Sequence, residues 1–459
     1  MLRMSSLFIW MASCQKSNLT QEPSCLLQLT PRAAPEPTCI SSSQWTEQFF
    51  VEPQPPPIPE QGSHWTSAAL KGNFALMAWS QFFPGIQGPP ALALIYSKEE
   101  GEWQLNANLT SLASWNSTDG VIWAVADLSV ENIAIAYSVS DATKLPVYSF
   151  VYTGTTWTLV NIEEFPAGQD CQFTGSNDDC LKLGGDLMVL RTALGGFETF
   201  QWQGTSWSPV PTANFTNPPS TTPFRFAVDG QRLVLTTSIL NAGLVPVVYV
   251  YEWTGSTWNG PSANFTPQAD AIILNVAVEG NYILTVLLQT DGTLTTRAYV
   301  HEYNAGSWQE VYSQVVGDPN ASANEIRDAD ISSTGKAVVA VDSSGLRRIV
   351  SFFERSLENL WGPTQTLVFN NARADSAVGI SATAVLVTGF EADGGGPFNF
   401  TATGRIQGCN TTETTTPTPP YGYSYSYYSR HSRRHRRAHC PKWCAGIHWW
   451  DWRCRHCRF

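Results

Sequence analysis

The sequence predicts an all-β protein: a seven-bladed β-propeller of four-stranded blades, closed by pairing an N-terminal strand into the last blade. Three observations predict this fold: a composition rich in aromatic residues and glycine, a tryptophan that recurs about every fifty residues, and an incomplete set of strands at each end of the repeats. Of the 459 residues, 12% are aromatic and only 14% are charged. This balance favours short β-strands, because exposed helices need more Lys, Glu and Ala.

Each repeat ends in a tryptophan, and successive tryptophans are separated by 58, 54, 50, 51, 50 and 53 residues. The series is Trp45, Trp103, Trp157, Trp207, Trp258, Trp308 and Trp361. In the clearest copy, an alternating strand over residues 248–253 leads into a Gly-x-x-Trp turn. Residues 226–235 form a second hairpin upstream, because Asp-Gly between two apolar runs is typical of a tight turn. We interpret the series as structural packing, with sugar stacking as the alternative.

Four-stranded sheets of this size cannot bury both faces alone, so they pack radially around an axis. After Trp361 we predict three strands, near residues 366–369, 377–388 and 398–405, without a terminal Gly-x-x-Trp. The missing strand is expected around Trp45, which gives seven blades over residues 43–408. The Pro-rich residues 53–59 then connect this strand to the first complete blade.

The remaining segments have distinct compositions. Residues 1–14 are interpreted as a signal peptide and residues 15–42 as an N-terminal extension. Residues 409–439 are Thr/Pro-, Tyr/Ser- and then Arg/His-rich, which predicts a disordered linker. Residues 440–459 form a small Cys- and Trp-rich tail, for which two small disulfides, a zinc site and an incorrect gene end stay open.

Ten cysteines and eight Asn-x-Ser/Thr sequons predict secretion or exposure at the cell surface. The predicted glycosylation sites are Asn108, Asn116, Asn214, Asn264, Asn320 and Asn399, with further sequons at Asn18 and Asn410. Asn108, Asn214 and Asn264 follow their tryptophans closely, so we expect them on connectors between blades. The predicted disulfides are Cys39–Cys409, beside the ring closure, and Cys171–Cys180, within the loop between blades two and three.

Charge argues against a nucleic-acid partner for the propeller. The net charge is −11, but residues 430–459 carry nine Lys or Arg and one acid, which leaves −19 for the rest. No apolar stretch reaches the length of about 18 residues that a membrane span needs. We therefore expect a monomeric propeller without a membrane span.

The repeats around Trp258 and residues 226–235 resemble the FG-GAP-type repeats of integrin α-subunit propellers, over residues 43–408. The resemblance implies a binding or adhesion scaffold. Two family features are missing: the Gly-Ala-Pro after the second strand, and the D-x-D-x-D calcium loops. Residues 228–231 leave no room for six or more oxygen ligands, so no cofactor or metal is expected and calcium should be dispensable.

No catalytic constellation stands out. The aspartate box of sialidase-like propellers also ends in Gly-x-x-Trp, but Tyr152, Trp202 and Trp253 stand where that box requires Asp. Histidine is scarce, at His64 and His301 only within the propeller. We expect a non-enzymatic binding or adhesion propeller that recognises a protein or glycan through its long loops, such as residues 80–90 and 238–246. The alternatives are a carbohydrate-active enzyme, which would place a carboxylate-rich pocket on the axis, and a propeller lectin.

Overall fold

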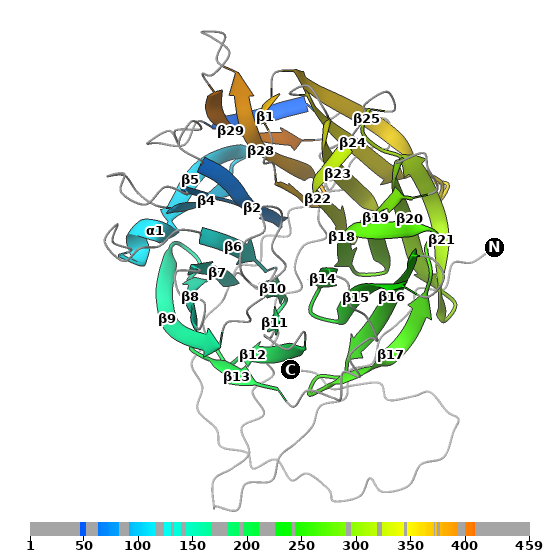
Figure 1. The fold of residues 1–459 in the computed structure, drawn as a ribbon. Helices are drawn as coiled ribbons and strands as arrows, with labels where there is room; N and C mark the ends of the chain where they lie inside the picture. The colour runs from blue at the N-terminus through cyan, green and yellow to red at the C-terminus, as the bar shows by residue number, and fades with distance from the viewer. Residues whose placement is uncertain are drawn as a thin grey trace, which may run out of the picture. The chain divides into compact units, whose positions relative to one another are not determined.

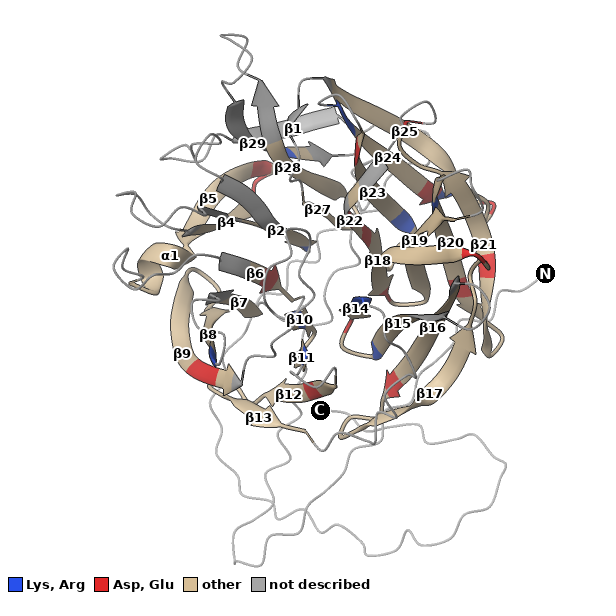
Figure 2. Cartoon of the chain, in the orientation of Figure 1, with Lys and Arg blue, Asp and Glu red and all other residues tan. Residues whose placement is uncertain are grey.

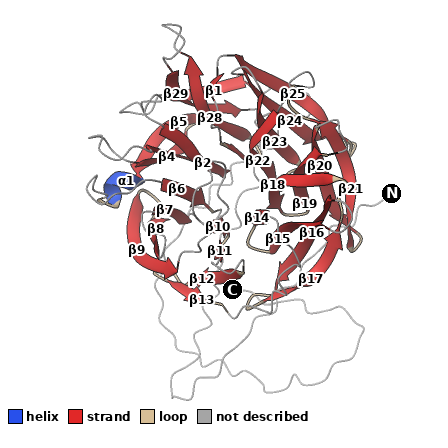
Figure 3. Cartoon of the chain, in the orientation of Figure 1, coloured by secondary structure: helices blue, strands red, loops and turns tan. Residues whose placement is uncertain are grey.

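The fold was determined from a computed structural model and is a seven-bladed β-propeller (Figure 1). The structure describes residues 46–51, 63–81, 91–114, 124–129, 133–138, 144–166, 181–191, 196–210, 225–240, 244–290, 295–318, 324–343, 347–370, 372–373, 377–392 and 400–408. In this part of the chain, nearly every residue outside a turn is in a strand (Figure 3). The all-β prediction is confirmed.

Six blades are formed by four consecutive strands each. Blade 1 comprises β2 (Ser63–Lys71), β3 (Phe74–Gln81), β4 (Ala91–Glu99) and β5 (Glu102–Asn108). Blade 2 comprises β6 (Ala124–Leu128), β7 (Ile133–Ser138), β8 (Lys144–Tyr152) and β9 (Trp157–Pro166). Blade 3 comprises β10 (Leu181–Gly184), β11 (Leu187–Arg191), β12 (Phe197–Trp202) and β13 (Trp207–Pro209).

Blade 4 comprises β14 (Arg225–Val228), β15 (Arg232–Leu240), β16 (Leu244–Trp253) and β17 (Trp258–Phe265). Blade 5 comprises β18 (Ala271–Glu279), β19 (Tyr282–Gln289), β20 (Thr296–Asn304) and β21 (Ser307–Val315). Blade 6 comprises β22 (Asn324–Ser332), β23 (Lys336–Ser343), β24 (Arg347–Arg355) and β25 (Trp361–Asn370). Residues 238–240 lie in β15 and residues 244–246 in β16, so the long loop expected over 238–246 is wrong.

Blade 7 joins the two ends of the ring. It contains β27 (Val378–Ile380) and the short β26 (Ala372–Arg373), both paired with β28 (Ala384–Ala392), then β29 (Phe400–Gly408) and finally β1 (Thr46–Val51). Strand β1 pairs antiparallel with β29, with Thr46 opposite Gly408 and Val51 opposite Gly404. The predicted closure by an N-terminal strand is therefore confirmed. Residues 366–369 lie in β25 and close blade 6, which corrects the strand predicted there for blade 7.

Antiparallel order within each blade gives the ring two different faces. The turns between first and second strands and those between third and fourth strands lie on one face, which we call the tight-turn face. The connectors between second and third strands and those between blades lie on the opposite face, the connector face. Positive φ angles at Gly72, Gly185 and Gly230 explain glycine in the first turns, because other residues rarely adopt that conformation.

The hydrophobic core lies between the blades. The described residues of the second strands are almost fully buried, because both faces of the sheet pack against neighbouring sheets. The cluster between blades 1 and 2, for example, joins Leu76 and Ile95 to Phe150 and Trp157. Seven such clusters occur among the described residues, so no single centre holds the ring together.

Most of the outer strands carry a β-bulge at a similar place. The extra residue is Asn106 in β5, Val160 in β9, Val311 in β21 and Thr364 in β25. A bulge disrupts the regular row of hydrogen-bonding groups on an edge strand and so opposes pairing with another chain. This feature agrees with the expected monomer, which stays a prediction.

A short helix, α1 (Leu109–Leu112), follows β5. The Asn108 side chain caps it by accepting a hydrogen bond from the Ser111 N–H at 3.0 Å. No helix in the described ranges is long and apolar enough to cross a membrane.

Candidate functional site

The axis of the propeller is lined by the innermost strand of every blade. Two cavities, of about 110 and about 230 Å³, lie along it. Lys71, Leu183 and Val228 line both, and the larger cavity opens among the glycine turns of the tight-turn face. Both volumes are below the range of about 300–1,000 Å³ typical of small-molecule sites.

Carboxylates gather at this axis. They come from Asp127 on β6, Asp328 and Asp330 on β22, Glu279 on β18, and Asp229 in the β14–β15 turn. The acidic residues of β6 and β22 lie toward the centre of the ring in Figure 2. Sequence analysis did not single out these residues. The signal that could have found them is an acid that interrupts an otherwise apolar inner strand, as in Ala126-Asp127-Leu128.

Each of these carboxylates bonds to the backbone of the next blade. Four of them accept an N–H bond across a blade boundary from an inner strand or its turn: Asp127 from Leu183 at 2.9 Å, Asp229 from Gly280 at 2.8 Å, Asp328 from Val378 at 3.0 Å and Asp330 from Ile380 at 2.9 Å. Glu279 accepts from the Ser333 N–H at 3.2 Å. These bonds satisfy backbone donors that an inner edge strand would otherwise leave unpaired. We call these five residues the axial clasps.

Three boundaries remain. Between blades 1 and 2, the Ser67 hydroxyl accepts the Ala126 N–H at 2.9 Å. At the other two, close backbone contact takes the place of a carboxylate. A Cβ atom on Gly184 of blade 3 would lie 2.6 Å from the Gly230 nitrogen of blade 4. A Cβ atom on Gly379 of blade 7 would lie 2.8 Å from the Leu70 nitrogen of blade 1. Only glycine permits this approach, because any side chain would collide with backbone atoms.

Lys71 spans the axis. Its ammonium group, from blade 1, forms an ion pair with Glu279 of blade 5, a blade that is not its neighbour. Burial lowers the pKa of Lys71, but the carboxylates of Glu279, Asp330 and Asp127 outweigh burial and raise it overall. Lys71 is therefore fully charged at neutral pH and holds opposite sides of the ring together.

Burial changes the ionisation of two axial clasps. Removal from water raises the pKa of Asp328 to about 7, although Lys182 and the backbone bonds oppose the change. Burial likewise raises the pKa of Asp330 to about 6, against the attraction of Lys71. The negative charge of Asp330 also raises the pKa of Asp328, and that of Glu279 raises the pKa of Asp330.

The tryptophan series lies at the start of the outer strands. Trp103, Trp157, Trp207, Trp258 and Trp361 are buried, and Trp308 is half-buried. They contact the preceding blade: the Trp207 indole donates to Ser149 Oγ and the Trp258 indole to Thr199 Oγ1, both at 2.8 Å. Trp45 directly precedes β1 and lies outside the described residues. These contacts support the interpretation of the series as structural packing.

We expect that replacing Trp258 with Phe destabilises the protein more than replacing Trp157 with Phe, by about 1 kcal/mol. Both indoles are buried, but Trp258 Nε1 donates to Thr199 whereas Trp157 Nε1 has no partner. The Trp157 variant thus controls for the loss of ring volume. Denaturant midpoints of the two variants measure the difference, and equal midpoints would contradict the assigned role of the hydrogen bond.

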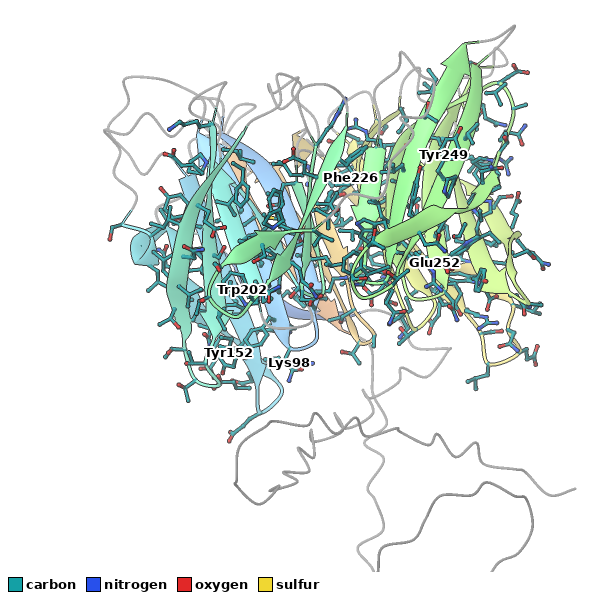
Figure 4. The ribbon with its side chains drawn as sticks, turned by 90° about the horizontal axis from the view of Figure 1, so that it is seen from below. Lys98, Tyr152, Trp202, Phe226, Tyr249 and Glu252 are labelled. Atoms are coloured by element: carbon teal, nitrogen blue, oxygen red, sulfur yellow. The ribbon has the colours of Figure 1, made fainter. Side chains whose placement is uncertain are left out.

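A second aromatic series faces the first across the hairpin. Tyr152, Trp202, Trp253 and Tyr303 pair with Trp157, Trp207, Trp258 and Trp308, at ring distances between 5.0 and 5.5 Å. All four are half-buried. Figure 4 shows Tyr152 and Trp202 toward the same edge of the ring as Lys98, which occupies the matching position in blade 1. In sequence, the first three stood out only as departures from the aspartate box.

Two of the predicted glycosylation sites lie in the described residues. Asn264 is exposed on β17, and Asn108 is the last residue of β5, so both lie in outer strands rather than on connectors, which corrects that expectation. Thr110 is the third residue of the sequon that begins at Asn108. Thr110 is buried, and its hydroxyl accepts the Ala93 N–H at 3.0 Å. Asn116, Asn214, Asn320 and Asn399, together with Cys39, Cys171, Cys180 and Cys409, lie outside the described residues.

Of the two histidines within the propeller, His64 lies in β2 and His301 in β20. His301 is buried on β20, where burial lowers its pKa to about 4, and its ring packs on Phe265 at 4.4 Å. Within the described ranges, no group of three or more His, Cys, Asp or Glu residues could hold a metal ion. Calcium independence stays a prediction.

Comparison with known proteins finds similarity only among solved structures. No protein-family model matches the sequence, and no curated protein matches it. Similar solved structures include the β-propeller domain of the Trilobed protease from Pyrococcus furiosus (9% identity, 71% of this chain and 91% of that chain, TM-score 0.39). Others are the WD40 domain of SCAP from fission yeast (11%, 80% and 98%, 0.38) and a hypothetical selenium-binding protein from Sulfolobus tokodaii (10%, 78% and 94%, 0.42).

Proposed function

We propose that this chain is a secreted or cell-surface, non-enzymatic binding propeller that recognises a protein or glycan ligand through its connector face. The observation that carries the proposal is that charged side chains at the axis bond to other blades. Lys71 spans the axis to Glu279, and the axial clasps bond to backbone amides of neighbouring blades. These charged groups hold the ring together, which leaves ligand recognition to the periphery.

Loop length favours the connector face as the binding surface. Turns on the tight-turn face join strands within a few residues, as at Lys71–Phe74. Residues 82–90, 167–180 and 211–224 connect strands on the opposite face. Binding residues concentrate on long loops that a rigid scaffold positions. The resemblance to FG-GAP-type repeats supports the same function, because those propellers are binding and adhesion scaffolds.

The test is a binding array of protein ectodomains and glycans probed with the purified glycoprotein. Substitutions within residues 82–90 should weaken binding of the ligand found. The matched control is the double variant Lys71→Met/Glu279→Leu, which removes both partners of the axial ion pair and should leave binding unchanged. Enzymatic removal of N-glycans should leave binding intact or raise it. Loss of binding in the axial control alone would place the site on the axis and contradict the proposal.

A glycosidase is the second candidate, favoured by one observation. Asp328 combines a raised pKa of about 7 with a position in the axial cavity, and a general acid needs such a pKa. Hydrolysis of chromogenic glycosides that disappears in Asp328→Asn would support this alternative. We favour binding because both oxygens of Asp328 accept backbone N–H bonds, from Ala329 and Val378.

A further inference from the structure

The second aromatic series places a ring at one position in four consecutive blades, all on the tight-turn face. Tyr152, Trp202, Trp253 and Tyr303 each precede the turn between the third and fourth strands of their blade. The backbone N–H of Trp202 and of Trp253 donates to the first turn of the same blade, at 2.8 and 2.7 Å. Two short turns therefore hold each of these residues. The arrangement of the blades fixes the spacing between their aromatic side chains.

Burial of the structural tryptophans does not require these rings. In blades 1 and 6 the matching position holds Lys98 and Arg355. Trp103 and Trp361, which face these two side chains, are only 5% and 9% exposed, against 3%, 6% and 1% for Trp157, Trp207 and Trp258. Both tryptophans are therefore buried without an aromatic residue at the matching position. Tyr152, Trp202 and Trp253 pack against the hydrophobic clusters between blades on one side, but each keeps part of its surface exposed.

The turns beside these rings are neutral and rich in hydroxyl groups. They run over residues 153–156 (Thr-Gly-Thr-Thr), 203–206 (Gln-Gly-Thr-Ser) and 254–257 (Thr-Gly-Ser-Thr). Thr155, Thr205 and Ser256 are exposed at their tips. In blade 5, by contrast, the Arg232 guanidinium lies over the Tyr303 ring at 5.4 Å. Blades 2, 3 and 4 therefore each present an aromatic side chain beside a hydroxyl-rich turn, without an arginine over the ring.

We propose that the tight-turn face of blades 2, 3 and 4 binds a neutral polysaccharide, with Tyr152, Trp202 and Trp253 as stacking platforms and the adjacent turns as hydrogen-bonding groups. An aromatic ring offers a flat apolar face to the C–H groups of a sugar ring, and hydroxyl side chains match its hydroxyl groups. Absence of charge in the three turns favours a neutral sugar over an acidic one. A polymer can engage several modules at once, which raises the apparent affinity.

This site lies on the face opposite the one proposed above for the principal ligand. The two proposals can therefore fail independently of each other, because their variants lie on different faces.

The test is affinity electrophoresis of the full chain in gels that contain a β-glucan, a mannan, a galactan or amylose. We expect at least one neutral polymer to retard the protein. Trp202→Lys and Trp253→Lys should each weaken binding about threefold to tenfold. Lysine is chosen because Lys98 already occupies this position in blade 1, 5.9 Å from the centre of the Trp103 ring, so the variants should fold. Trp202→Phe keeps a ring and should retain most of the binding.

The reciprocal variant is Lys98→Trp, which adds a fourth platform beside blade 2 and should strengthen binding. Thermal unfolding of each variant separates loss of a platform from loss of fold. Retardation by none of the four polymers would overturn the proposal, and so would retardation that Trp202→Lys leaves unchanged. Binding of a proline-rich peptide with the same sensitivity to these variants, in place of sugars, would also overturn it.

Discussion

Replacing Gly184 with alanine is expected to destabilise the protein by about 3 kcal/mol or more. The added Cβ would lie 2.6 Å from the Gly230 nitrogen and 2.7 Å from the Val228 carbonyl carbon and oxygen. These are backbone atoms of the next inner strand, which cannot move without shifting blade 4 away from blade 3. Overpacking a tight core contact costs about 1–3 kcal/mol even when side chains can adjust, and here they cannot.

Gly362→Ala is the matched control, because a Cβ at that position in β25 meets no heavy atom within 4 Å. Urea or thermal unfolding of both variants, followed by tryptophan fluorescence, measures the difference. Gly379→Ala should behave like Gly184→Ala, since its Cβ would lie 2.8 Å from the Leu70 nitrogen. If Gly184→Ala unfolds at the same midpoint as Gly362→Ala, the boundary between blades 3 and 4 is looser than described.

Stability should fall as pH rises from about 4 to 8, and the Asp328 carboxyl should account for much of the fall. Its pKa is raised from 3.8 when unfolded to about 7 in the folded protein. A carboxyl with a raised folded pKa contributes its full stability below the unfolded pKa and loses that contribution as pH passes the folded value. One pKa unit corresponds to about 1.4 kcal/mol, so the shift at Asp328 amounts to at most about 4 kcal/mol.

Asp328→Asn isolates this contribution. The amide oxygen can still accept the Val378 N–H bond, but the residue no longer ionises. Denaturant midpoints of the variant should therefore depend less on pH than those of the parent protein, with the largest difference above pH 7. Glu164→Gln serves as the control, because Glu164 pairs with Lys144 on the exposed outer surface. A parent protein whose stability rises steadily from pH 4 to 8, with the Asp328→Asn variant following the same curve, would contradict the prediction.

Local sequence patterns predicted most of the architecture. The interval between tryptophans and the glycine turns identify one blade each, because a hairpin is specified by a few consecutive residues. Closure was also predictable, since a strand without partners at each end of a repeat array must pair or leave an exposed edge. Sequence also identified Trp258 and its equivalents as packing residues, although not the particular partner, Thr199 of the preceding blade.

The contacts at the axis, in contrast, depend on the tertiary structure. Lys71 and Glu279 are 208 residues apart and meet only because the ring brings blades 1 and 5 face to face across its centre. In sequence, Asp328 and Asp330 do not differ from other strand residues. Their role depends on β27 of blade 7, whose N–H groups donate hydrogen bonds to them. The two aromatic series differ in the same way. Both are regular in sequence, but only the packing of one blade on the next buries Trp207 and leaves Trp202 half-exposed. Repeats specify each blade through local contacts, whereas the positions of the axial charges and the partial exposure of the second aromatic series depend on contacts between blades that no local pattern encodes.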